Sequence, residues 1–269
     1  MSKKFFGVCA LTREYGQFVK SHLIPRALTR LSRTGENYIQ SGIGEPMKRV
    51  PDSWYDMKLV AKDGEDILAD IDDIGIRELR DNHLIWSSWG GHESLRDILE
   101  INSELPFRML RLQNSNALRL FFLSLLWRAG ASHLSDFRHV VLTPVEIEDL
   151  RERILNRDPG APQDYPIILH QISTRGAHHN RAPILEEDTI TVEGQPEHKV
   201  VYVRFYFEGL VARIHLGNRS QLPDYFSKLG INDRYEFVVY LHEFDNSRTK
   251  DNLVSMMQDY TERRGAGAY

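Results

Sequence analysis

Hydrophobic spacing changes twice along the 269-residue chain. Residues 5–24 hold short apolar runs on either side of a turn that contains Gly16, as in a β-hairpin. Residues 63–155 mostly place apolar side chains three or four positions apart, which is the spacing of amphipathic helices. Beyond residue 158 apolar and polar residues alternate, as in half-buried strands. The pattern therefore predicts an α+β fold with a mainly antiparallel β region at its C-terminal end.

The central helices are expected to be buried. A helix at residues 63–79 would begin with Asp63 as its N-cap. Residues 107–131 are predicted to form one long helix, because their apolar side chains cover most of its circumference. A Thr-Pro-Val-Glu capping box at residues 143–146 begins a third helix, which ends near residue 155.

The turn-forming sequence Asp-Pro-Gly-Ala-Pro at residues 158–162 follows these helices and is the best candidate for a domain boundary. We expect a hairpin-and-helix region at 1–82, a helical scaffold at 83–157 and a β-rich region at 158–269. Strands are predicted at residues 167–172, 199–207, 210–216 and 235–242, with a tight turn at 207–210 and a closing helix at 253–263.

Two segments of the N-terminal region have weaker patterns. Residues 32–51 are rich in glycine and serine without sustained periodicity, and we predict a long loop there. Residues 54–60 alternate weakly, which favours a short strand.

Candidate chemistry gathers in residues 9–25, CALTREYGQFVKSHLIP. The hairpin leads to His22, and Pro25 permits the first turn of a helix at 26–31, because its missing N–H would have no partner at that position. His22 is therefore expected at the junction of a strand and a helix.

This layout resembles the HNH, or ββα-metal, nucleases, and most closely a bacterial group with the pattern Cys-x-x-Cys, Ser-His-Ile-Ile-Pro, Leu-Cys-x-x-Cys-Glu. Residues 21–25 read Ser-His-Leu-Ile-Pro, and Cys9 stands at the first cysteine position. Thr12, Ala61 and Gly64 stand at the other three. Since structural zinc needs four nitrogen or sulfur ligands, we expect no structural zinc. Residues 121–129 also resemble the scaffold helix of this group, so the resemblance covers about half the chain.

The resemblance implies which residues would act in an HNH site. His22 would be the base that deprotonates water, and His22, Glu65 and Asp72 would hold Mg²⁺ or Mn²⁺. The basic residues expected to contact phosphate are Lys20, Arg26, Arg30 and Arg33.

Two functions remain open on these residues. The first is a metal-dependent nuclease that cleaves phosphodiester bonds of DNA or RNA, as part of a bacterial antiviral or mobile-element system. The alternative is a catalytically inactive HNH-like subunit that binds nucleic acid or a partner effector protein. Loss of the zinc cysteines is compatible with both.

Charge limits how nucleic acid could bind. The formal net charge is −4, so the whole molecule does not attract phosphate, and any such contact needs a local basic surface. The first fifty residues supply an excess of lysine and arginine, and the next thirty are rich in aspartate and glutamate. A solvated basic face beside a solvated acidic helix is the simpler interpretation of the same asymmetry.

A cytoplasmic protein with no membrane partner is expected. A single cysteine permits no internal disulfide, which suits a reducing compartment. The N-terminal lysines precede no apolar signal segment, and no apolar run approaches the length that crosses a bilayer.

The remaining motifs are weaker. His178 and His179, beside Arg175 and Arg181, are more simply a solvent-facing turn than a metal or phosphate site. A serine, a histidine and an aspartate at residues 132–136 are too close in sequence for a catalytic triad, and the Gly-x-Ser-x-Gly elbow and the common Gly-rich phosphate loops are missing from the sequence.

Overall fold

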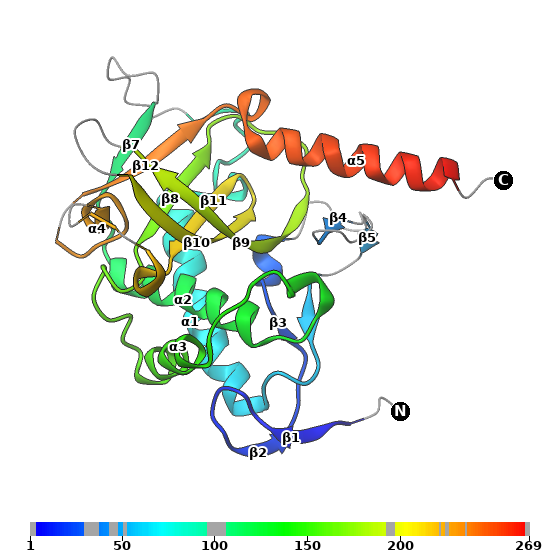
Figure 1. Cartoon of the computed structure of the whole chain (residues 1–269), viewed down its shortest axis with the longest axis vertical. Helices are drawn as coiled ribbons and strands as arrows, with labels where there is room; N and C mark the ends of the chain where they lie inside the picture. The colour runs from blue at the N-terminus through cyan, green and yellow to red at the C-terminus, as the bar shows by residue number, and fades with distance from the viewer. Residues whose placement is uncertain are drawn as a thin grey trace.

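The structure is a computed structural model that describes residues 4–29, 38–42, 48–50, 53–95, 106–191, 197–220, 222–223, 226–234 and 236–266. It has an α+β fold, as predicted, with one large mixed sheet and a group of helices against it. In Figure 1 the helices α1, α2 and α3 lie together on one side of this sheet.

The large sheet has eight strands. In spatial order they are β5 (Lys48–Val50), β4 (Tyr38–Ser41), β9 (Asn180–Ile190), β10 (His198–Phe207), β11 (Leu210–His215), β8 (Ile167–Ile172), β12 (Phe237–His242) and β7 (Phe107–Leu110). All neighbours are antiparallel except the pairs β4 with β9 and β8 with β12, which are parallel. The predicted C-terminal strands are present, and three strands from earlier in the chain extend the sheet at its two edges.

Five α-helices accompany the sheet in the described residues. They are α1 (Lys62–Asp81), α2 (Ser115–Ala131), α3 (Pro144–Asn156), α4 (Phe226–Leu229) and α5 (Arg248–Ala266). Short 3₁₀ turns occur at Arg26–Leu28, Trp86–Ser88, Ser135–Phe137, Gly217–Arg219 and Phe244–Asn246. None of the described helices is both long enough and apolar enough to cross a bilayer. Helix α5 extends away from the rest of the molecule towards the C-terminus (Figure 1).

The N-terminal segment forms two small antiparallel pairs outside the large sheet. Strand β1 (Phe6–Val8) pairs with β2 (Tyr15–Gln17), and β3 (Ser21–His22) pairs with β6 (Tyr55–Asp56). In Figure 1 the β1–β2 pair lies at the end of the molecule farthest from the large sheet, beyond α1.

Helix α2 is the centre of the core. Its side chains from Leu118 to Ala129 are almost entirely buried, and they pack against α1 and the inner face of the sheet in one hydrophobic cluster. Helix α1 approaches closely at Gly75, because any larger side chain there would overlap Phe121. The same core contains residues from the N-terminal pairs, from the helices and from the sheet.

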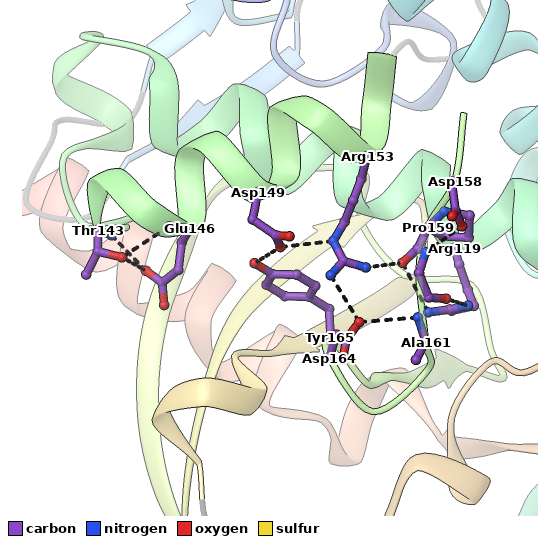
Figure 2. A network of polar contacts seen from close by, with 11 residues as sticks. Arg119, Thr143, Glu146, Asp149, Arg153, Asp158, Pro159, Ala161, Asp164 and Tyr165 are labelled. Atoms are coloured by element: carbon purple, nitrogen blue, oxygen red, sulfur yellow. Dashed lines mark hydrogen bonds and ion pairs between the residues drawn. The ribbon is translucent and has the colours of Figure 1, made fainter. Parts of the chain in front are cut away.

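A network of polar contacts fastens the end of α3 to the turn at residues 158–165 (Figure 2). Arg153 donates to Asp149, to the carbonyl of Pro159 and to Asp164, at 2.9, 2.8 and 3.0 Å. Tyr165 donates its hydroxyl to Asp149 at 2.7 Å, and Arg119 of α2 reaches the turn from the other side. The predicted capping box is also confirmed, since Thr143 and Glu146 exchange both hydrogen bonds. The turn is therefore held against two helices.

Two predicted segments differ in the structure. Residues 107–131 are not one helix: residues 107–110 alternate and pair with β12, and the helix begins only at Ser115, after Asn114 accepts a hydrogen bond from the Ala117 N–H at 3.1 Å. Residues 32–51 are not a continuous loop, since β4 and β5 pair with each other and β4 pairs with β9. Partners distant in sequence decide both strands, and local spacing does not reveal them.

Candidate active site

The strand β3 fixes the position of His22. His22 stands opposite Tyr55 of β6, and the Tyr55 ring meets the imidazole edge-on with centroids 6.2 Å apart. Leu23 and Ile24 follow it into the core, with exposed fractions of 0% and 1%. The Leu23 N–H donates to the carbonyl of Trp54 at 3.0 Å. The apolar part of the Ser-His-Leu-Ile-Pro sequence therefore anchors the backbone, and the histidine stays partly exposed.

Helix α1 places two acidic side chains near this histidine. Glu65 and Asp72 are two turns apart and share one face of the helix. Burial raises the pKa of both carboxyls, and the charge of His22 makes a smaller, opposing contribution to each. Arg128 donates both to Asp72 and to the His22 carbonyl, which holds this strand against α1. The three residues that the sequence predicts as metal ligands therefore lie in one region.

Asp72 already has a partner, which sequence reasoning missed. Arg128 of α2 donates from Nη1 to Asp72 Oδ2 at 2.9 Å, and a second bond joins Nη2 to Oδ1. The side chain of Arg128 is 2% exposed and that of Asp72 is 16% exposed, so this is a buried ion pair. Burial raises the pKa of Asp72, and the Arg128 guanidinium opposes that shift.

Arg128 also holds the strand that carries His22. Its Nη1 donates to the His22 carbonyl at 3.0 Å, and its Nη2 donates to Ser124 Oγ at 2.8 Å. One guanidinium thus fixes α1 and β3 to α2. The sequence contained one sign of this ion pair: an arginine lies inside the most apolar helix of the chain, and a buried charge requires a partner.

Glu65 lies beside the Ser21 hydroxyl. Burial raises the pKa of Glu65, while the nearby Ser21 hydroxyl, Arg128 and His22 lower it. Glu65 Oε2 and the Ser21 hydroxyl are both buried, and neither forms a hydrogen bond of good geometry within the described residues, although the hydroxyl is close enough to lower the pKa of Glu65. Buried polar atoms without a well-formed hydrogen bond are uncommon in folded proteins, which makes this pair a candidate position for a ligand.

These donors fit some cations and not others. Mg²⁺ and Mn²⁺ prefer oxygen ligands, and Mg²⁺ keeps several waters, so Glu65 and His22 suffice to hold such an ion. Asp72 is held in an ion pair with Arg128, and its assignment as a direct ligand stays a prediction. No three histidine, cysteine, aspartate or glutamate side chains in the described part of the chain form a ready metal cluster.

The positions matched to zinc cysteines lie beside one another. A Cβ added at Gly64 would be 2.8 Å from the sulfur of Cys9, and the Thr12 N–H donates to that sulfur at 3.4 Å. Ala61 is the N-cap of α1, three residues before Gly64, and it forms an isolated β-bridge with Phe18. The turn after β1 and the first turn of α1 are therefore in contact around one buried thiol.

Two of the four basic residues predicted to contact phosphate belong to the part of the chain that the structure describes. Lys20 and Arg26 are exposed on either side of His22, and the Lys20 ammonium lies 4.1 Å from the centroid of the Tyr55 ring. Arg30 and Arg33 lie outside the described residues. The basic side chains next to His22 are thus accessible to a polyanion.

The remaining histidine prediction needs a correction. His179 does not face solvent: it is 5% exposed and stacks on Tyr206 with ring centroids 4.7 Å apart. Only His178 is exposed, as expected for a turn. The strand β9 begins at Asn180, directly after this histidine, and its pairing draws His179 into the structure.

Searches of protein-family models, of curated proteins and of solved structures returned no match to this chain.

Proposed function

We propose that this chain is a metal-dependent phosphodiesterase acting on nucleic acid, with His22 as its general base. The observation that supports this most directly is the proximity of the partly exposed His22 to Glu65 and to the Asp72–Arg128 ion pair. The buried Oε2 of Glu65, which forms no hydrogen bond of good geometry within the described residues, adds a candidate ligand near the histidine.

Each group has a distinct role in the proposal. His22 accepts the proton of the attacking water, and Lys20 and Arg26 hold the phosphate backbone of the substrate. Glu65 holds a divalent cation, which when bound would offset negative charge on the reacting phosphate. Arg128 is a positioning residue, since it is buried and fixes the backbone of His22.

The first test replaces His22 with alanine. With Mg²⁺ or Mn²⁺ the wild-type chain is expected to cleave plasmid DNA or single-stranded RNA, and His22→Ala should slow cleavage by roughly 10²- to 10⁴-fold, the usual contribution of a general base. His133→Ala is the matched control, because His133 is an exposed histidine with no assigned role. Equal cleavage by His22→Ala and wild type would remove His22 from the mechanism.

A second function is favoured by one specific observation. Asp72 is neutralised by Arg128, so the site holds fewer free carboxylates than the sequence pattern implies. In this alternative the chain binds nucleic acid or a protein partner without cleaving it, and Lys20 and Arg26 supply the contact. Binding that persists in His22→Ala and in excess chelator, without any cleavage by the wild type, would favour this alternative.

A further inference from the structure

The outer face of the large sheet, opposite α1, α2 and α3, has a cluster of basic and aromatic side chains. Along each strand the side chains alternate between faces. Leu169, Ala212 and Val239 point into the core with the helices, so their neighbours in sequence point outward. The outward group, here called the basic patch, comprises His170, Arg213, His215, Tyr240 and His242.

Strand register places these residues next to one another. Tyr240 of β12 stands beside His170 of β8, and Arg213 and His215 lie on the adjacent strand β11. His170 Nδ1 is 3.1 Å from His242 Nε2, and the ring of Tyr240 stacks on His170 with centroids 5.2 Å apart. These contacts join three strands, β11, β8 and β12, into one surface.

Arg213 is the exceptional member of the basic patch. Its cross-strand neighbour Arg204 forms two bonds to the Glu186 carboxylate, at 3.0 and 3.1 Å. Arg213 instead lies over the ring of Tyr202 at 5.1 Å, and its Nε is buried without a hydrogen bond. Across the described residues, no carboxylate forms an ion pair with it. The Glu186 carboxylate thus neutralises Arg204, whereas the charge of Arg213 is not neutralised by an ion pair within the described residues.

His215 provides a second unpartnered group. It is 3% exposed, and its Nδ1 makes no hydrogen bond to any described residue. His215 packs between Tyr202 and Phe226, with ring centroids 5.1 and 4.8 Å away. His170, Arg213, Tyr240 and His242 remain partly exposed. The basic patch therefore has a buried polar floor and a rim that a ligand can reach.

The electrostatics of the basic patch are one-sided. Burial lowers the pKa of His170, and the charges that lower it further are Arg213, His242 and His215. Burial also lowers the pKa of His242, and Arg213 again adds to the shift. No acidic group contributes to either histidine. Because the lowered pKa values keep these histidines neutral, Arg213 carries the positive charge of the basic patch, and an anion would offset that charge.

We propose that the basic patch binds the phosphate group of a nucleotide or nucleic acid, with Arg213 as the main contact and Tyr240 as a surface for base stacking. Arginine suits this role because its planar fork can donate two hydrogen bonds to one phosphate. Tyrosine and histidine rings on an open sheet are surfaces on which bases stack. This site is separate from the region around His22, which lies on the helical side of the sheet.

The test measures binding of inorganic phosphate, adenosine monophosphate and a short single-stranded oligonucleotide by calorimetry, in chelator. Arg213→Gln should weaken binding at least about tenfold, since it removes hydrogen bonds between charged groups. Lys199→Gln is the matched control, because it also replaces a basic side chain with glutamine, at an exposed position of β10 in the same sheet. His242→Gln gives a second, milder variant at the rim, which should also weaken binding.

The outcomes separate the sources of phosphate. Equal binding of all three probes supports a site for phosphate alone, tighter binding of the mononucleotide supports stacking on Tyr240, and tighter binding of the oligonucleotide supports a nucleic-acid strand. Absence of binding by all three, or unchanged binding in both Arg213→Gln and His242→Gln, would overturn the proposal. Cleavage measured with His22→Ala is a separate readout, so either proposal can fail without the other.

Discussion

At the scale of single residues, the Arg128–Asp72 ion pair is the contact that determines the candidate active site. The partners are 56 positions apart in sequence and come from α2 and α1. Both charges are largely buried, so each depends on the other for compensation. The pair therefore combines a structural role with control over the position of His22.

Removal of one partner should be severe. Arg128→Met leaves the Asp72 carboxylate and the His22 carbonyl without their donor, and we expect a loss of about 3–5 kcal/mol in the free energy of unfolding. Denaturant-induced unfolding measures this loss. The double variant Arg128→Met with Asp72→Leu should recover part of it, because no unpaired charge remains. A loss below about 1 kcal/mol in the single variant would show that water already compensates the pair.

Sequence reasoning reached part of this site. The Ser-His-Leu-Ile-Pro sequence and the acidic spacing of α1 indicate His22, Glu65 and Asp72 as candidates, because those patterns are local, and their roles stay predictions. Arg128 was visible only as a charge that interrupts an apolar run. Its partner could not be named, because nothing in the spacing of residues shows which faces of two helices meet.

At the scale of elements, the contact between the turn after β1 and the start of α1 is the most informative. Cys9 lies in the turn and Gly64 in the first turn of α1, and a Cβ added at Gly64 would lie 2.8 Å from the Cys9 sulfur, so a side chain there requires Cys9 to shift. Thr12, Gly64 and Cys9 are therefore near one another around a buried thiol, at three of the four positions that the resemblance matches to zinc cysteines, although this chain has one cysteine.

This arrangement can be tested by restoring the cysteines. The triple variant Thr12→Cys, Ala61→Cys and Gly64→Cys gives four thiols with Cys9, and we expect it to bind about one zinc ion per chain. Zinc content after dialysis and the thermal midpoint with and without chelator measure the effect. Adding Cys9→Ser to the triple variant should abolish tight binding. Failure of the triple variant to retain zinc would weaken the resemblance to the zinc-bearing group.

Other elements show what local pattern can and cannot predict. The capping box at Thr143 and the turn between β10 and β11 are confirmed, because both depend on residues within a few positions of one another. The strands β4 and β7 were missed, because each gains its conformation from a neighbour far away in sequence. Alternation over four residues is too short to distinguish such a strand from a helix or a loop.

At the scale of the whole molecule, buried histidines make stability depend on pH. Burial lowers the pKa of His215 to about 3 and that of His179 to about 4. Both are therefore neutral in the folded chain, whereas in the unfolded chain they take up protons near pH 6.5. Their contribution to stability is complete above about pH 6.5 and is lost as pH falls towards the folded pKa values.

Denaturant-induced unfolding between pH 7 and pH 4 should show this loss. Each histidine adds up to about 1.4 kcal/mol per pH unit to the decline. His215→Phe keeps an aromatic ring between Tyr202 and Phe226 and removes the titrating group, so its stability should fall less steeply than that of the wild type. Identical slopes for the two chains would show that His215 takes up its proton as readily in the folded chain as in the unfolded chain.

The pairing of strands across the turn at 158–162, such as β4 with β9, also determines how a fragment of the chain would behave. Residues before the turn at 158–162 supply the outermost strands on both sides of the sheet, β5 with β4 on one side and β7 on the other. A fragment that began after this turn would present two bare rows of amide and carbonyl groups to other molecules, a template for self-association. The N-terminal half covers the start of β9 and four residues of β12, and we therefore expect such a fragment to aggregate more readily than the whole chain.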